Sequence, residues 1–278
     1  MANIYDETTN LNDSEIAYLI DELPLWSAPF GMELLDNIAY QKNMKVLDIG
    51  CGNGFPLLVL AQRLGESCDI YGLEPWLASF SIAAEKIRKM ELKNAFVLLD
   101  TAEDMNFQDD YFDMIVSNNG LNNVQNMEMA FMSCSRVAKK GCRFVYTMNL
   151  PETMKEFYSC FRESVSEILN SGYVDKIDEH IHSKRKSLQY LKDITEGNGF
   201  DIIDAIEKEF KMKYLNGTAF LKDFIIRMAF MVPWKKIIPD EYHKQVFYDI
   251  ESKLNKVAED KGFLSLSIPY VCIVSEKV

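Results

Sequence analysis

Residues 46–54 read Val46-Leu47-Asp48-Ile49-Gly50-Cys51-Gly52-Asn53-Gly54. The apolar residues on both sides of Asp48 favour a short, buried, parallel strand. The glycines that follow permit positive φ angles and let a ligand approach the backbone closely. Pro56 and the apolar run 57–60 then begin a helix, whose free N–H groups and positive dipole end suit an anionic group. The stretch therefore predicts a strand, a glycine turn and a helix, with a ligand at the turn.

The spacing of the glycines indicates which class of ligand the turn binds. It is G-x-G-x-G, whereas the dinucleotide pattern is G-x-G-x-x-G, and Phe55 stands where that third glycine would be. With Asp48 two residues ahead, the stretch resembles the first motif of the class I S-adenosylmethionine (SAM)-dependent methyltransferases. In that family the turn receives the methionine part of SAM, and the equivalent of Asp48 orients the turn and the methionine amino end. The resemblance implies a Rossmann-like α/β fold: a seven-stranded, mostly parallel sheet, its last strand antiparallel, with helices on both faces and a helical cap.

A second acid follows at the spacing of a ribose-binding residue. Residues 69–74 predict a strand that ends at Glu74, 24 residues after Gly50, close to the offset of about 20 in a Rossmann-type βαβ unit. A carboxylate at this strand end can accept hydrogen bonds from both ribose hydroxyls. The family keeps its second motif here, and Pro75 and Trp76 follow where the adenine edge is expected. The alternative is a solvated acid at the end of a strand.

The third expected strand, 94–99, ends at an acidic loop. The loop reads Asp100-Thr101-Ala102-Glu103, where the family often reads G-D-A-E. Aligning on Ala102 and Glu103 puts Thr101 where the family has aspartate and Asp100 one residue early. The resemblance leaves the adenine contact open between Asp100 and Thr101, and the Ala102 backbone N–H is able to donate in either case.

The fourth expected strand, 111–117, carries another family hallmark, F-D-x-I-V-S, and an asparagine-rich turn follows it. Ligands of doubly wound sheets lie beyond the carboxyl ends of the strands, so Asn118 is expected at the cofactor and Asn119 and Asn122 at the substrate. The alternative for this turn is local side-chain bonding. Related enzymes often carry a histidine near Asn122, which is absent here, and the sequence identifies no catalytic base.

The remaining chain predicts three regions. Residues 1–40 form an N-terminal helical lid, with helices near 13–20 and 29–40, and Trp26 and Phe30 either line the substrate pocket or anchor the lid to the sheet. Residues 41–150 form the SAM-binding core. Further helices are expected at 77–90, 127–137 and 188–198, and a turn at 139–141 is expected to lead into a fifth strand, 142–148. Residues 151–278 complete the sheet with strands near 201–214 and 263–275, and the insertion 215–262 forms a helical cap, with helices near 220–231 and 241–260.

Two polar clusters in the C-terminal half have simple interpretations. His180 and His182 form an H-x-H pair, but no nearby cysteine or third histidine supports a metal site, so no metal is expected. Lys184-Arg185-Lys186 has the charge to bind an anionic substrate, yet so short a run is usually a solvated surface.

Composition limits the partners and the compartment. The net charge is −12, and residues 1–149 carry 21 acidic against 11 basic side chains, which disfavours a nucleic-acid partner. The six cysteines are dispersed, which suits buried thiols in a reducing compartment. No signal peptide and no apolar run of about 18 residues is found, so no membrane span is expected and the cytoplasm is the expected location.

The sequence therefore resembles a class I SAM-dependent methyltransferase of the small-molecule type that includes the ubiquinone and menaquinone C-methyltransferases. SAM is the expected cofactor and a small molecule the expected acceptor, while the oligomeric state stays open. Two alternatives remain: a SAM-binding protein without turnover and an NAD(P)-dependent oxidoreductase. The third glycine of the dinucleotide pattern is missing, which disfavours the oxidoreductase.

Overall fold

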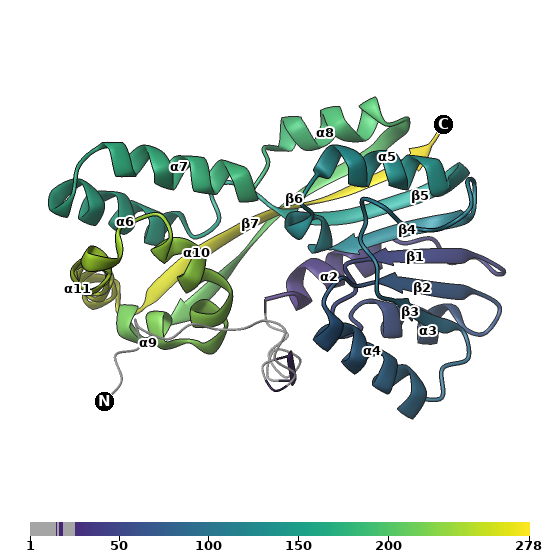
Figure 1. The fold of residues 1–278 in the computed structure, drawn as a ribbon, viewed down its shortest axis with the longest axis horizontal. Helices are drawn as coiled ribbons and strands as arrows, with labels where there is room; N and C mark the ends of the chain where they lie inside the picture. Colours follow the sequence, from purple (N-terminus) through teal and green to yellow (C-terminus); the bar gives the residue numbers. More distant parts are fainter. Residues whose placement is uncertain (1–14, 16, 19–25) are drawn as a thin grey trace. The chain divides into compact units, whose positions relative to one another are not determined.

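The computed structural model describes residues 15, 17, 18 and 26–278. Its seven strands form one sheet in the order β3-β2-β1-β4-β5-β7-β6 (Figure 1). The strands are β1 (Lys45–Ile49), β2 (Asp69–Leu73), β3 (Ala95–Leu98), β4 (Phe112–Asn118), β5 (Ala138–Asn149), β6 (Phe200–Tyr214) and β7 (Leu264–Lys277). Strands β3, β2, β1, β4 and β5 are parallel, and β7 pairs antiparallel with β5. The predicted fold class is confirmed.

One set of helices is interspersed with strands β1 to β6 along the chain. They are α2 (Ala28–Asp36), α3 (Leu57–Leu64), α4 (Leu77–Lys89), the 3₁₀ turn η1 (Gly120–Asn123), α5 (Met127–Val137) and α8 (Leu188–Gly197). The predicted helices that begin near Pro29, Pro56, Leu77, Met127 and Leu188 are all present. The predicted helix near 13–20 lies mostly outside the described residues.

The strand–turn–helix unit is held by a common apolar core. Val46 of β1, Ile70 of β2 and Met114 of β4 lie in one cluster with Leu34 of α2 and Leu57 of α3, all fully buried. Burial on this scale supplies the main stabilising term, at about 25 cal/mol per Å² of apolar surface. The apolar runs of the sequence therefore fix where β1 ends and where the glycine turn begins.

One predicted turn is wrong. Residues 139–141 were expected to form a turn ahead of the fifth strand, but β5 already begins at Ala138. The pairing register with β4 jumps from Phe112–Ala138 to Met114–Arg143. Gly141 has φ +80° within this irregularity. A bulge absorbs the extra residues, so the strand continues through the expected turn.

By its internal contacts the chain divides into two units. Among the described residues, the sheet unit comprises 26–149, 187–208 and 270–278 together with residues 15, 17 and 18, and the helical unit comprises 150–186 and 209–269. Strands β6 and β7 contribute to both. The helices of the helical unit are α6 (Lys155–Ile168), α7 (Gly172–Lys184), α9 (Gly217–Lys222), the π-helix η2 (Ile226–Met231), α10 (Val232–Lys235), the 3₁₀ turn η3 (Asp240–Tyr242) and α11 (His243–Lys261).

The predicted helix near 220–231 is interrupted. Helix α9 ends at Lys222, and Asp223 Oδ1 accepts the N–H groups of Ile225 and Ile226 at 2.9 and 3.2 Å. This is how an N-cap side chain satisfies the first free donors of a new helix. The apolar periodicity was correct on both sides, but the capping aspartate divides the segment into α9 and η2.

Among the described helices, none combines the length and apolar character that crossing a bilayer requires. The six cysteines are free thiols and all are buried, as the sequence predicted.

Candidate functional site

The glycine turn joins the carboxyl ends of β1 and β2. The N–H groups of Gly50 and Cys51 both donate to the Leu73 carbonyl, at 2.9 and 3.0 Å. Gly50, Gly52 and Gly54 have φ angles of +70°, +54° and +109°, a region that favours glycine. A Cβ on Gly52 would meet no heavy atom within 4 Å, so the backbone there is open to an approaching ligand.

Glu74 closes this turn from the end of β2. Its side chain is only 3% exposed, so the interpretation as a solvated acid is wrong. Oε2 accepts the Gly52 N–H and Oε1 accepts the Trp76 N–H, each at 2.9 Å. Burial raises the pKa of Glu74, and these two backbone donors oppose the rise. The carboxylate is thus held rigidly at the strand edge, and each oxygen keeps a second lone pair for another donor.

Asp48 lies beneath the turn and is completely buried. Neither of its oxygens accepts a hydrogen bond from a described residue. Burial raises its pKa to about 8; the Leu57 N–H opposes the shift without forming a bond of regular geometry, and the charge of Glu74 adds to it. A buried carboxyl group without a donor is costly when ionised, so this position suits a cationic ligand group that would pair with it.

Asp48→Asn is expected to stabilise the protein at alkaline pH. The folded-state pKa of Asp48 lies above its ordinary value of 3.8, so its contribution to stability is present below about pH 4 and is lost as pH rises toward 8. Between about pH 4 and pH 8, a difference of one bound proton between the folded and unfolded states changes the unfolding free energy by about 1.4 kcal/mol per pH unit. The difference in unfolding free energy between variant and wild type, from urea titrations at pH 6 and pH 8, should therefore grow in favour of the variant by more than ~1 kcal/mol. A difference that does not change with pH would contradict the buried, unpaired state of Asp48.

Two glycine backbones cross where β1 and β4 end. A Cβ on Gly120 would lie 2.2 Å from the Ile49 carbonyl oxygen, and one on Gly50 would lie 2.8 Å from the Gly120 Cα atom. Ser117 Oγ donates to the same Ile49 carbonyl at 3.0 Å and accepts the Leu121 N–H at 3.2 Å. The position of the glycine turn therefore depends on the turn after β4.

The asparagines after β4 form a polar cluster with β5. The Asn122 amide donates to Asn119 Oδ1 and to Asn149 Oδ1, the latter at 2.7 Å. Asn119 has φ +62°, and its N–H donates to the Thr147 carbonyl and hydroxyl oxygens, both at 3.2 Å. Local side-chain bonding thus orders this turn. Asn122 Oδ1 is buried and accepts no bond from a described residue, so it retains an acceptor for a ligand.

Asn118 links three segments of the site. It is 7% exposed; its amide donates to the Ser27 carbonyl at 3.2 Å, and its Oδ1 accepts the Thr147 hydroxyl at 3.1 Å. This bonding places the start of α2 beside the ends of β4 and β5. Asn118 is therefore a structural link as well as the predicted cofactor contact.

The acidic side chains of the loop after β3 form hydrogen bonds within the loop and with the segment before α5. Asp100 accepts the Thr101 N–H at 2.8 Å and the Asn106 N–H at 3.4 Å. Glu103 Oε1 accepts the N–H groups of residues 125 and 126 at 2.6 and 3.2 Å. Thr101 is exposed and Ala102 is buried. Glu103 therefore holds the loop ahead of α5, and Thr101 is the exposed member of the four predicted residues 100–103.

Three other predicted residues occupy distinct environments. Cys51 is fully buried, and its thiol lies toward Gly72, where an added Cβ would meet Sγ at 2.7 Å. Only the backbone of Cys51 thus belongs to the turn. Pro75 and Trp76 are exposed, Trp76 by 38%, next to the Glu74 carboxylate. An exposed indole beside a buried carboxylate is suited to cover a flat ring.

Trp26 and Phe30 pack on each other with ring centroids 5.7 Å apart. Phe30 is fully buried and stands edge-on to Tyr270 of β7 at 4.8 Å, so this ring anchors α2 to the sheet. Trp26 is half-buried and remains a predicted pocket residue.

A further contact joins the glycine turn to the segment before α2. The Asn53 amide donates to the Ala17 carbonyl at 2.7 Å, and Ala17 packs on Ala78 and Ile82 of α4. Lys86 of α4 donates to the Asn53 carbonyl at 3.0 Å. Ala17 therefore lies against the turn.

The sequence interpretation missed four residues that build this site: Asn53, Gly120, Thr147 and Asn149. Gly120 follows Asn119 at a strand end, and an Asn-Gly pair is a signal that could have singled it out. Thr147 and Asn149 lie in β5, where only the pairing with β4 reveals that they face the asparagine turn.

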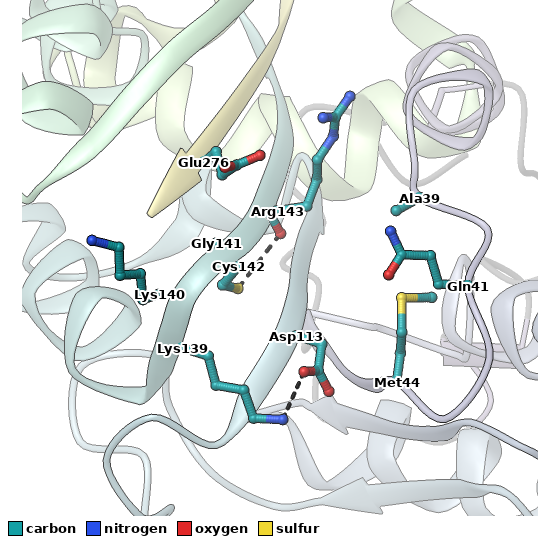
Figure 2. A pocket seen from close by; sticks show the side chains of 10 residues that line it. All are labelled: Ala39, Gln41, Met44, Asp113, Lys139, Lys140, Gly141, Cys142, Arg143 and Glu276. Carbon is teal, nitrogen blue, oxygen red and sulfur yellow. Dashed lines mark hydrogen bonds and ion pairs between the residues drawn. The ribbon is translucent and has the colours of Figure 1, made fainter. Parts of the chain in front are cut away.

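A cavity also lies elsewhere in the sheet unit. Figure 2 shows Asp113, Lys139, Cys142 and Arg143 around it, at the amino-terminal ends of β4 and β5. Lys139 pairs with Asp113 at 2.6 Å. Ligands of doubly wound sheets lie at the carboxyl ends of the strands, so the glycine turn is the better candidate.

No group of three potential metal ligands occurs in the part of the chain that the structure describes. His180 and His182 both lie on α7, and His182 is exposed.

Comparison with known proteins agrees with this geometry. A family described as "Methyltransferase domain" matches residues 40–193, more than half of the chain. The demethylmenaquinone methyltransferase of Geobacillus sp. (strain WCH70) is 30% identical over 105 residues, which cover 38% of this chain and 45% of that protein. The mitochondrial ubiquinone biosynthesis O-methyltransferase of Rattus norvegicus is 28% identical over 164 residues, 57% of this chain and 45% of that protein. The chain thus spans about half the length of these curated relatives.

Solved structures share the fold. A putative methyltransferase from Bacillus halodurans superposes with a TM-score of 0.59 at 16% identity, covering 89% of this chain and 98% of that one. A geranyl diphosphate methyltransferase in complex with GPP and sinefungin superposes with a TM-score of 0.55 at 16% identity, covering 90% and 78%.

Proposed function

Since this chain belongs to the methyltransferase domain family, we propose that it transfers a methyl group from SAM to a small-molecule acceptor. The observation that carries the proposal is the pair of buried acids at one glycine turn: Asp48 beneath it and Glu74 across it. One suits a ligand ammonium group and the other a ribose, which together match the two ends of SAM.

The residues of the turn would divide the binding between them. Glu74 accepts the ribose hydroxyls with the lone pairs that its two backbone donors leave unused. Asp48 lies where it can compensate the ammonium charge, and the open backbone at Gly52 admits the methionine chain. Trp76 covers the adenine. SAM, when bound, supplies a methyl group on a sulfonium centre that is open to in-line attack.

The residues of this chain contribute to the reaction by positioning the reactants and by excluding water. Asn119, Asn122 and Asn149 orient polar acceptor groups at the strand edge. The contact of Asn53 with Ala17 supports the proposed N-terminal lid, which would keep water from the turn. Relatives named demethylmenaquinone methyltransferase support a small-molecule acceptor. The division into a 41–150 core, a 1–40 lid and a 215–262 cap, and the cytoplasmic location, stay predictions.

Calorimetric titration with SAM, with S-adenosylhomocysteine and with NADH tests the proposal. We expect micromolar binding of the first two ligands and none of NADH. Binding of NADH alone would replace the proposal with an oxidoreductase. Binding of SAM without methyl transfer to any of a broad acceptor panel would favour a SAM-binding protein without turnover.

A further inference from the structure

Among the residues that the structure describes, the most buried cation of the helical unit has no counter-ion. Arg185 follows α7 and is 4% exposed, so it is not part of a solvated basic run. It forms no ion pair with any residue that the structure describes. Burial lowers its pKa, and the groups that oppose this effect are on Tyr158 rather than on a carboxylate. An unpaired charge at this depth is strongly destabilising, because the protein does not replace the hydration that burial removes.

Two other partly buried cations of the same unit, Arg162 and Lys253, each have an acidic partner, unlike Arg185. Arg162 of α6, 37% exposed, pairs with Asp178 of α7. Lys253 of α11, 18% exposed, lies within 4 Å of Asp249, Glu163 and Glu167. Acids are therefore available in this unit, yet none is placed at its most buried cation.

The surroundings of Arg185 are neutral and aromatic. One guanidinium N–H donates to the Thr153 carbonyl at 3.0 Å, and the guanidinium lies 5.1 Å over the Tyr158 ring. Tyr158 accepts the indole N–H of Trp234 at 3.0 Å. His180 stands beside Tyr158 with ring centroids 6.5 Å apart; burial, then Arg185 and Lys184, lower its pKa to about 4, so it is uncharged at neutral pH.

We propose that Arg185 is the receptor for the anionic group of a ligand, a carboxylate or phosphate attached to an apolar or aromatic body. The planar guanidinium suits bidentate binding of such an oxyanion, and the guanidinium N–H groups that do not bond to Thr153 are the donors. Tyr158 and Trp234 make the surroundings apolar, which strengthens the pairing. That this ligand is the methyl acceptor rests on the proposed function; the anion site itself does not.

The test is a titration of the full chain with benzoate and phenyl phosphate, with benzyl alcohol as the neutral control. Thermal unfolding and NMR shifts of His180 are followed for wild type, Arg185→Met, Arg185→Lys and the matched control Arg162→Gln. We expect wild type and Arg162→Gln to be stabilised by one or both anions but not by the alcohol. Anion binding should weaken at least tenfold in Arg185→Lys, which keeps the positive charge but loses the planar pair of N–H donors. It should vanish in Arg185→Met. The two anions show whether carboxylate or phosphate is preferred.

A purely structural arginine predicts a different result. If Arg185 is only structural, Arg185→Met unfolds at a lower temperature than wild type. The anions then stabilise all four proteins equally or stabilise none of them, and either of these two anion results overturns the proposal. If Arg185 is an anion receptor, Arg185→Met instead unfolds at or above the wild-type temperature without ligand, because a costly charge is removed. If Arg185→Met does not fold, the comparison of anion binding by Arg185→Lys and by Arg162→Gln still tests the proposal. SAM titration of the same proteins separates the two proposals: anion binding without SAM binding refutes only the methyltransferase, and SAM binding without anion binding refutes only this site.

Discussion

Replacing Glu74 with alanine is expected to weaken SAM binding at least ~100-fold, because two charge-assisted hydrogen bonds to the ribose are each worth ~1.5–3 kcal/mol. The carboxylate is nearly buried and fixed by the Gly52 and Trp76 N–H groups, so no other side chain at the turn replaces it. Calorimetry of the variant against wild type measures the loss. Glu66→Ala, which removes an exposed acid in the turn between α3 and β2, is the control for loss of charge and should bind like wild type.

Glu74 also holds the glycine turn, so the ribose contact has to be separated from that role. Wild type should bind adenosine more tightly than 3′-deoxyadenosine, since the latter lacks one partner of the carboxylate. The Glu74→Ala variant should bind the two nucleosides equally weakly. A variant that weakens both nucleosides but still distinguishes them would show that Glu74 acts only through the turn.

Gly120→Ala should destabilise the protein by about 3 kcal/mol, a large value for one methyl group. The new Cβ would lie 2.2 Å from the Ile49 carbonyl oxygen, 2.9 Å from Ser117 Oγ and 3.0 Å from Gly50 Cα. Two of these are backbone atoms of the strand end and the turn, which cannot rotate away as a side chain can. Relief requires the ends of β1 and β4 to separate, and this displaces Gly50 and Asp48. We therefore also expect SAM affinity to fall more than tenfold.

Thermal unfolding and calorimetry measure both effects, with a drop in unfolding temperature of roughly 5–10 °C. Gly197→Ala is the matched control, since a Cβ at this residue of α8 meets nothing within 4 Å and its φ is not positive. That variant should be as stable as wild type or slightly more so. Equal behaviour of the two variants would contradict the close crossing of Gly50 and Gly120.

The local elements were predictable because each depends on neighbours in the sequence. Apolar runs and glycines placed β1, α3 and β2 within a residue or two of their observed bounds. The same pattern placed Asp48 and Glu74 at strand ends on the ligand side. Prediction was wrong where a single residue changed the local geometry: Gly141 within a bulge continues β5, and Asp223 as a cap divides a helix.

The contacts between distant residues were not predictable from the sequence. Nothing in the spacing shows that Gly120 touches Gly50, that Asn122 reaches Asn149, or that Arg185 of a basic triplet is buried against Tyr158. Each pairing depends on strand order or helix packing, which bring together residues with no regular sequence separation.

The sequence by itself determined the strand–turn–helix unit, the two acids and the resemblance to methyltransferases, because backbone preferences and apolar periodicity act over a few residues. Only the tertiary structure decided which of these groups are buried, and therefore how they are charged. Asp48 has its pKa raised to about 8 because the packed core removes water from it, and Glu74 is fixed because two N–H groups from separate segments meet it. Desolvation and hydrogen bonding of this kind arise only when the whole sheet unit has assembled.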